Sequence, residues 1–305
     1  MGIPDLPGRR EHRPRYASAI VGADVGTDYV VARDVDEAIR LKAEGRIVLA
    51  GGTDHYPVRV GRSTASESIV DITGIAGLRG IVREGDVWRF GALTRWADVA
   101  RCDLPRGFDA LRVAARDVGA VQVQNAGTIA GNLVTASPAG DGIPSFLALD
   151  ASVEVAGPSG LRVLPLGDFV TGYRATALGP DELVTAILVP AASGEAGSSF
   201  LKLGLRRYLV ISVVMVAAQI EASDGAITAA RVAVGACSPV ALRLPGLEAD
   251  LVGRRVDGDL ASLVTADHLA PLTPIDDVRA TAAYRLRAAH TLVGRAVVDA
   301  AGRSS

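Results

Sequence analysis

The segment Val48-Leu-Ala-Gly-Gly-Thr-Asp54 joins an aliphatic run to two glycines, a hydroxyl and a carboxylate. Gly51 and Gly52 lack Cβ atoms, so their backbone N–H groups can converge on a phosphate oxygen, and Thr53 adds a hydroxyl donor. The pattern matches neither the Rossmann fingerprint nor the P-loop. Taken alone, the segment is better explained as an ordinary tight turn, because glycine pairs commonly follow strands.

A second segment, Gly127-Thr-Ile-Ala-Gly-Asn-Leu-Val-Thr-Ala-Ser-Pro-Ala-Gly-Asp141, is dense in small polar side chains. Its hydroxyl and amide groups alternate with small or aliphatic residues, a composition suited to lining a polar ligand. The Asp141 carboxylate can accept a hydrogen bond from a sugar hydroxyl. A long surface loop with Asx and Ser/Thr turns explains this segment equally well on its own. Two donor-rich glycine segments about 75 residues apart in one chain fit the two phosphates of a dinucleotide better than either fits one phosphate.

Strand and helix patterns alternate around these segments, and segment 127–141 itself is expected to be rich in turns. Helices are predicted by capping and apolar periodicity, and strands by short aliphatic runs between turn residues. The patterns predict helices over 35–43, 96–101, 109–118 and 277–301, strands over 47–50, 88–91, 209–220 and 227–235, and a hairpin of 152–155 with 161–164.

Composition indicates a globular chain with an aliphatic core. The 305 residues are 49% hydrophobic and 22% charged, with 4% aromatics, 34 glycines and a formal net charge of −2. The balanced charge argues against a nucleic-acid partner. The apolar stretch 17–23 after Arg9-Arg10 is too short for an export signal, and no run approaches the roughly 20 apolar residues of a membrane span. We therefore expect a flexible tail over residues 1–28 and a cytoplasmic protein.

Cysteine and histidine spacing argues against a metal site in this chain. Cys102 and Cys237 are far apart in unrelated contexts, and the four histidines show no ligand spacing. The cysteines are expected to be free thiols, as in a reducing compartment, and any iron–sulfur cluster must lie in another chain. No nucleophile elbow or Ser/His/Asp set is present, so we assign no catalytic acid, base or nucleophile.

Taken together, the segments resemble the FAD-binding medium subunit of molybdenum hydroxylases, the xanthine dehydrogenase and aerobic carbon monoxide dehydrogenase family. The resemblance covers roughly residues 29–301. Its most specific pieces are Leu49-Ala-Gly-Gly-Thr-Asp54, Thr128-Ile-Ala-Gly-Asn132 with Ala136-Ser-Pro-Ala-Gly-Asp141, Ala230-Arg-Val-Ala-Val-Gly235, and Pro274-Ile-Asp-Asp-Val-Arg279 leading to Tyr284-Arg285.

The resemblance implies an α+β fold in which a two-lobed PCMH-type FAD-binding domain precedes a smaller α+β domain with an antiparallel sheet plus helices. We expect the FAD-binding domain over 29–190 (lobes about 29–75 and 76–190), a linker over 191–199, and a C-terminal domain over 200–305 like that of the carbon monoxide dehydrogenase flavoprotein.

The resemblance also implies a set of residues that bind FAD noncovalently. Around the pyrophosphate and neighbouring ribityl oxygens it places Ala50, Gly51, Gly52, Thr53 and Asp54, and in the second loop Thr128, Gly131, Asn132 and Thr135, with Asp141 on a sugar hydroxyl. Leu183 or Val184 would pack on the adenine, and Lys202 would lie near the flavin ring. Ala130 replaces a frequent family glycine, and Tyr208-Leu-Val-Ile211 replaces acidic or alanine-rich sequence. Roles for His55 and Tyr208 near the flavin stay open.

The implied function is electron transfer within a complex. FAD would take electrons from the [2Fe-2S] clusters of a small partner subunit and pass them to NAD⁺, oxygen or another acceptor, while a large partner subunit holds molybdopterin. A dimer of heterotrimers is expected. The alternatives are a stand-alone PCMH-type FAD oxidoreductase and a cofactor-free scaffold subunit.

Overall fold

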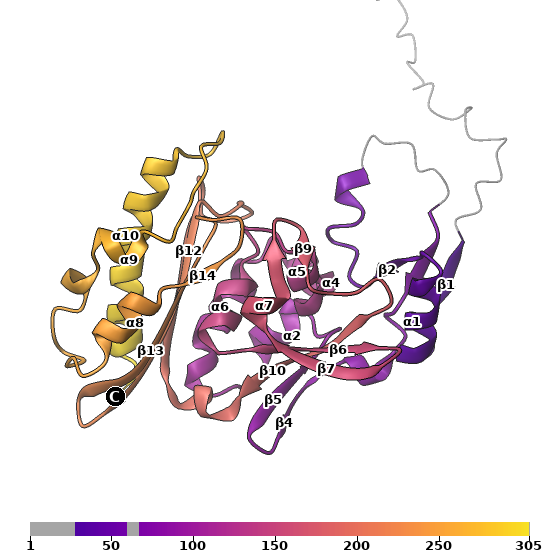
Figure 1. The fold of residues 1–305 in the computed structure, drawn as a ribbon, viewed down its shortest axis with the longest axis horizontal. Coiled ribbons are helices and arrows are strands. Elements are labelled where there is room, and N and C mark those ends of the chain that lie inside the picture. The colour runs from indigo at the N-terminus through magenta and orange to yellow at the C-terminus, as the bar shows by residue number, and fades with distance from the viewer. Residues whose placement is uncertain (1–27, 60–66, 305) are drawn as a thin grey trace, which may run out of the picture.

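The computed structural model describes residues 28–59 and 67–304 of the chain, so the tail predicted over 1–28 lies almost wholly outside the described residues. Figure 1 shows a small first lobe, a central second lobe and a C-terminal domain arranged in a row. The fold is α+β throughout, and a domain with two lobes precedes a smaller domain, as the sequence predicts. No helix in the described ranges is long and apolar enough to span a membrane.

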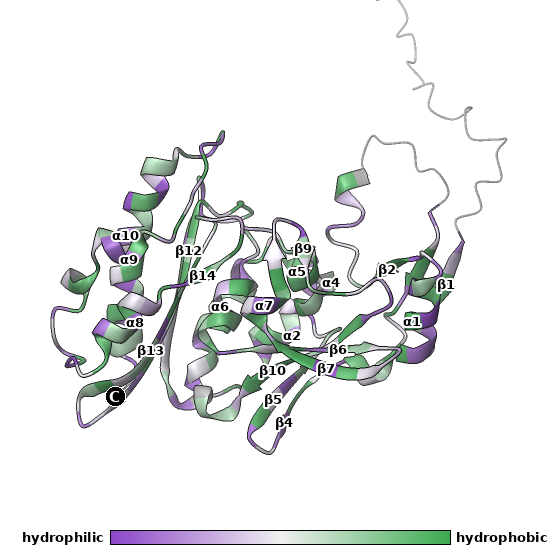
Figure 2. Cartoon of the chain, viewed as in Figure 1, coloured by the Kyte–Doolittle hydropathy of each residue, from purple (hydrophilic) through white to green (hydrophobic). Residues whose placement is uncertain are grey.

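The first lobe is a parallel sheet with one helix against it. Its strands, in the order β1-β3-β2, are β1 (Tyr29–Val31), β3 (Ile69–Asp71) and β2 (Ile47–Leu49), and α1 spans Val35–Ala43. The Asp34 side chain accepts a hydrogen bond from the Glu37 N–H at the start of α1, which confirms the predicted helix. Helix α1 directs its buried aliphatic residues at the sheet, and Figure 2 shows hydrophilic residues on its other side.

The second lobe is a five-stranded antiparallel sheet covered by helices. The strands, in sheet order, are β4 (Ile81–Glu84), β5 (Val87–Gly91), β10 (Leu183–Pro190), β6 (Ser152–Gly157) and β7 (Gly160–Pro165). The helices are α2 (Trp96–Arg101), α3 (Asp109–Asp117), α4 (Val121–Ala126), α5 (Ile129–Thr135), α6 (Gly142–Ala148) and α7 (Leu166–Phe169), and β8 (Val170–Gly172) pairs with β9 (Ala175–Thr176).

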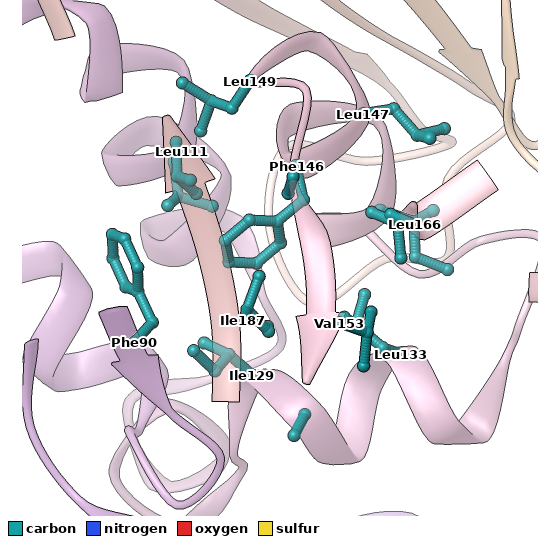
Figure 3. Packing of buried hydrophobic residues seen from close by; sticks show 14 of the residues in the cluster. Phe90, Leu111, Ile129, Leu133, Phe146, Leu147, Leu149, Val153, Leu166 and Ile187 are labelled. Carbon is teal, nitrogen blue, oxygen red and sulfur yellow. The ribbon is translucent and has the colours of Figure 1, made fainter. Parts of the chain in front are cut away.

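The core of the second lobe holds sheet and helices together. In Figure 3 the ring of Phe146, from α6, lies close to Ile187 of β10. Phe146 also meets Phe90 edge to face, with ring centroids 6.0 Å apart. Burying each of these side chains stabilises the fold by about 1.5–3 kcal/mol, so the helices that carry the second glycine segment are fixed on a rigid sheet.

The C-terminal domain packs one long helix across an antiparallel sheet. The sheet contains β11 (Gly197–Leu203), β12 (Val214–Ser223), β13 (Ala226–Gly235) and β14 (Leu242–Arg243), and the helices are α8 (Pro245–Leu251), α9 (Ala266–Leu269) and α10 (Ala282–Ala301). Hydrophobic colour prevails along β12 in Figure 2, because that central strand is buried for most of its length.

Two predicted element starts and one predicted turn-rich segment differ from the structure, and each difference has a local cause. Helix α10 begins at Ala282 rather than at residue 277, because Thr281 caps it and the Asp277 side chain accepts the N–H groups of a preceding turn. Segment 127–141 contains a helix, α5, capped by the Thr128 hydroxyl. The strand predicted from residue 209 begins only at Val214, because residues 204–213 form the loop between β11 and β12.

The predicted linker 191–199 contains ordered elements as well. Residues Ala191–Glu195 form a 3-10 helix, and β11 already begins at Gly197. A Cβ atom at Gly197 would lie 2.5 Å from the Ser304 backbone nitrogen. The lack of a side chain at Gly197 therefore lets β11 pack closely against Ser304. A linker prediction from composition cannot distinguish a glycine needed for close packing from one that makes the chain flexible.

Charged side chains join the C-terminal domain to the second lobe. Asp150, which follows α6, accepts hydrogen bonds from Arg231 of β13 and from Arg243 of β14, the latter at 2.7 Å. The backbone N–H of Ala236 also donates to the carbonyl of Pro138, 2.9 Å away, inside the second glycine segment. The two domains thus meet directly behind that segment.

Candidate functional site

A cleft of about 950 Å³ is lined by all three parts of the fold. The first lobe contributes the loop after β2, the second lobe contributes α2, α4, α5 and β10, and the C-terminal domain contributes Leu209, Val210 and Ile211. Small-molecule pockets commonly measure about 300–1,000 Å³. The cleft is therefore at the upper end of the size range of small-molecule pockets and is much larger than a single phosphate needs.

The two glycine segments touch each other through their backbones at this cleft. A Cβ atom on Gly51 would lie 2.7 Å from the carbonyl carbon of Ala126 and 2.9 Å from the Cα of Gly127. Across the same contact, a Cβ on Gly127 would lie 3.1 Å from the Thr53 hydroxyl. Gly52 has φ +67°, a conformation that favours glycine. The segments thus form one continuous surface, and glycine is required where they meet.

Helix α5 orients the polar groups of the second segment. The Thr128 hydroxyl accepts a hydrogen bond from the Gly131 N–H at 3.1 Å and so fixes the first turn. Asn132, one turn further, has a buried Oδ1 atom with no hydrogen-bond partner among the described residues. Because an unpaired buried polar atom is costly, it is expected to find a partner in a bound ligand. Thr135 lies at the other end of α5 and also lines the cleft.

Asp141 lies at the cleft in a buried ion pair. Its Oδ2 accepts a hydrogen bond from the Lys202 ammonium at 2.6 Å, and its Oδ1 accepts one from the Ser212 hydroxyl at 2.6 Å. Burial raises the pKa of Asp141, whereas the Lys202 charge and the two hydrogen bonds oppose that rise. Lys202 also donates to the carbonyl of Asp117 at 3.2 Å, so its ammonium points at protein oxygens.

The structure brings twelve of the thirteen predicted site residues to one cleft. Besides the glycine segments, Leu183 and Val184 of β10 line it and supply an apolar wall. Lys202 does not line this cleft and reaches it only through its bond to Asp141. Of the two residues whose roles stay open, His55 lines the cleft, and Tyr208 is exposed and lies under the Arg207 guanidinium, 5.3 Å from its ring centroid.

Sequence reasoning missed two residues that matter for the charge and shape of the cleft. Arg174, in the turn between β8 and β9, makes a two-pronged ion pair with Asp54 at 2.9 and 3.0 Å. Hydrogen bonding to Asp54 raises the pKa of Arg174, so the cation stays charged and offsets the carboxylate beside the glycines. Trp96 is buried, lines the cleft and would clash with a Cβ on Gly142. No motif marks either residue, because both reach the site through tertiary packing.

The arrangement suits binding rather than acid–base chemistry. The cleft is lined by glycine backbone, threonine and serine hydroxyls and the Asn132 amide, together with aliphatic and charged side chains. In the described ranges, no group of three or more His, Cys, Asp and Glu side chains is placed to hold a metal ion. Both cysteines are free thiols.

Comparisons with known proteins match the whole architecture. Residues 23–192 match the family model of the FAD binding domain in molybdopterin dehydrogenase, and residues 199–300 match that of the CO dehydrogenase flavoprotein C-terminal domain. The chain is 30% identical over 287 residues to the 6-hydroxypseudooxynicotine dehydrogenase complex subunit alpha of Paenarthrobacter nicotinovorans, covering 91% of this chain and 95% of that protein. It is 29% identical to the carbon monoxide dehydrogenase medium chain of Hydrogenophaga pseudoflava, covering 88% and 95%.

Solved structures agree with these matches. A chain of carbon monoxide dehydrogenase from Hydrogenophaga pseudoflava superimposes with a TM-score of 0.84 at 30% identity, covering 91% of this chain and 98% of that one. The order of the two domains and the cleft-bearing lobes therefore correspond along nearly the full length.

Proposed function

Because the chain belongs to the family of FAD-binding medium subunits of molybdenum hydroxylases, we propose that its cleft binds FAD noncovalently and that it carries electrons between partner subunits and an external acceptor. The observation that supports this most directly is the backbone contact of the two glycine segments at Gly51 and Gly127. When bound, FAD supplies the redox chemistry.

The residues of the cleft fit the parts of FAD. We propose that the two glycine segments surround the pyrophosphate and the neighbouring ribityl oxygens. Asp141 would hold a sugar hydroxyl, and Lys202 would lie near the flavin ring. The Arg174 guanidinium neutralises Asp54 there, so a diphosphate can approach without repulsion from that carboxylate. The unpaired Asn132 Oδ1 supplies an acceptor, and Leu183 and Val184 offer an apolar surface for the adenine.

We also propose partner subunits and a cellular location for the chain. Electrons would arrive from the [2Fe-2S] clusters of a small subunit, a large subunit would hold molybdopterin, and NAD⁺, oxygen or another acceptor would receive the electrons. We propose a dimer of such heterotrimers in the cytoplasm, with free thiols as supporting evidence. The domain limits 29–190 and 200–305 also remain proposals, supported by separate hydrophobic cores and by the two family matches.

Tryptophan fluorescence tests FAD binding in the isolated full-length chain. The protein has two tryptophans, and Trp96 lines the cleft whereas Trp88 does not. In a Trp88→Phe variant, added FAD should quench the remaining Trp96 emission with a saturable dependence, and the protein should keep a visible flavin spectrum after gel filtration has removed unbound FAD. A folded protein that stays unquenched and colourless would support the cofactor-free scaffold instead.

Purification of the native assembly tests the partners. Iron and molybdenum subunits that copurify with the chain in equal amounts support the complex. A flavin-loaded chain that purifies alone and reduces its own substrate would indicate the stand-alone PCMH-type oxidoreductase.

A further inference from the structure

Lys42, on helix α1 of the first lobe, reaches across to the second lobe. Its ammonium donates to the carbonyl of Gly179 at 2.7 Å and to that of Glu182 at 2.5 Å. Burial lowers the pKa of Lys42, and the neighbouring carboxylates of Glu182 and Asp181 oppose that fall. Lys42 also lines the cleft. The first lobe is thus joined to residues 179–182 by a compact cation that donates to two oxygens at once.

Segment 179–182 is a tight turn with its own internal hydrogen bonds. The N–H of Glu182 donates to the carbonyl of Gly179 at 3.3 Å, and the Glu182 carboxylate accepts the Gly179 N–H at 2.7 Å. Arg162 of β7 holds the same carboxylate with two hydrogen bonds of 2.7 Å. The two carbonyls that Lys42 contacts therefore belong to one well-braced unit of the second lobe.

This turn leads directly into the apolar wall of the cleft. Strand β10 begins at Leu183, and both Leu183 and Val184 line the cleft. Successive side chains of a strand point to opposite faces, and accordingly Leu183 belongs to the core of the first lobe whereas Val184 belongs to that of the second. A shift of the first lobe relative to the turn would therefore move this wall at the point where the two cores meet.

We propose that Lys42 is a positioning residue that makes the cleft select FAD over FMN, a flavin nucleotide that lacks the adenylate half. By holding the 179–182 turn to α1, Lys42 keeps Leu183 and Val184 where the adenine packs. This inference rests on the proposed FAD site and concerns its adenine end alone. The proposed contacts to the flavin and the pyrophosphate come from other residues, so loss of the Lys42 ammonium should weaken only ligands that carry adenosine.

The test compares ligands with and without adenosine in the full-length chain carrying Trp88→Phe. FAD and FMN affinities are measured from the Trp96 emission, and ADP affinity is measured by calorimetry. Lys42→Met should weaken FAD and ADP binding by the same factor of at least about tenfold, the effect of one hydrogen bond from a charged group, and FMN binding should stay within about twofold of the parent.

Arg40→Met is the matched control on the same helix. The Arg40 side chain is 61% exposed and forms ion pairs with Glu37 and Glu44, close to it in the chain. This variant should bind all three ligands as the parent does. Lys42→Arg is a second test variant, because it keeps a cation beside the turn. It should weaken FAD binding by less than Lys42→Met and leave FMN binding unchanged.

Two results would overturn the inference. Equal losses of FAD and FMN affinity in the Lys42 variants would mean that Lys42 supports the fold in general rather than the adenine end. Unchanged FAD affinity in Lys42→Met would mean that the contact with the turn does not matter for binding. In both cases a parent protein that binds FAD leaves the proposed function standing, whereas a parent that binds neither FAD nor FMN removes both.

Discussion

Replacing Gly51 by alanine should disrupt the cleft where the two glycine segments meet. The new Cβ would lie 2.7 Å from the carbonyl carbon of Ala126, and it must retreat by at least about 0.7 Å to reach the 3.4 Å of ordinary van der Waals contact. The obstructing atoms are backbone, so no side-chain rotation relieves the clash. A hydrogen bond of about 2.9 Å that is stretched by this amount falls outside the normal range, and under the proposed function several such bonds would converge on the FAD diphosphate.

We therefore expect Gly51→Ala to weaken FAD binding by about 100-fold, corresponding to about 2.7 kcal/mol, which is the net contribution of one strong hydrogen bond to a charged group. Overpacking of this kind costs about 1–3 kcal/mol of folding stability, which leaves the protein folded. FAD affinity is measured by Trp96 fluorescence, and melting temperature is recorded beside it.

Gly77→Ala is the matched control, because a Cβ at Gly77 meets nothing within 4 Å. That variant should bind FAD as the parent does. A Gly51→Ala protein with FAD affinity within twofold of the parent would refute the argument that the contact between the glycine segments forms the phosphate site.

Three further predictions concern charge. Asp150→Asn removes a carboxylate that two arginines share, and asparagine tolerates the φ of +51° at this position. We expect the free energy of unfolding to fall by about 1 kcal/mol and the melting temperature in calorimetry to fall by about 2–4 °C. An unchanged melting temperature would contradict a role for these ion pairs. Lys202→Met leaves Asp141 buried without its cation and should destabilise the chain by about 3–5 kcal/mol in denaturant unfolding, whereas the double change with Asp141→Asn should recover part of that loss. Hydrogen bonding from Arg162 lowers the pKa of Glu182 to about 2 from 4.5. The ion pair therefore stabilises the fold fully above about pH 4.5, and this stabilisation is lost as pH falls toward 2. The melting temperature of Glu182→Gln should fall less than that of the parent between pH 6 and pH 2, and an equal fall in both proteins would exclude this contribution of Glu182.

Local signals predicted the elements that depend on local interactions. Helix α1 follows from the Asp34 cap and the hairpin β6–β7 from its turn, and both form as predicted. The sequence did not predict helix α5, because its threonines and glycine are typical of turns. These residues are helical because Thr128 caps the first turn and the helix packs on the core. The apolar stretch that begins at residue 209 has the composition of a strand. Hydrogen bonds from Val213 to Leu203 and from Ser212 to Asp141 hold it in a loop outside the sheet.

The site shows the same division between local and tertiary information. The glycine segments were identifiable because glycine pairs and hydroxyls carry their own chemistry, and the structure places both at one cleft. Arg174 and Ser212 have ordinary sequence surroundings, and each acquires its role from a carboxylate more than 70 positions away in the chain. The motif Pro274–Arg279 and Arg285 are explained only by the fold. There Asp277 pairs with Arg285, which also donates to the carbonyl of Val213 at the end of the loop before β12.

The backbone contact between Gly51 and Ala126 also limits how the lobes can move. Because backbone meets backbone there, neither lobe can shift toward the other, and a few residues along the chain the Arg174–Asp54 ion pair ties the same lobes together. A change in the angle between the lobes that opens the cleft must therefore break this ion pair. A long ligand held between the glycine segments would leave only after the lobes have parted.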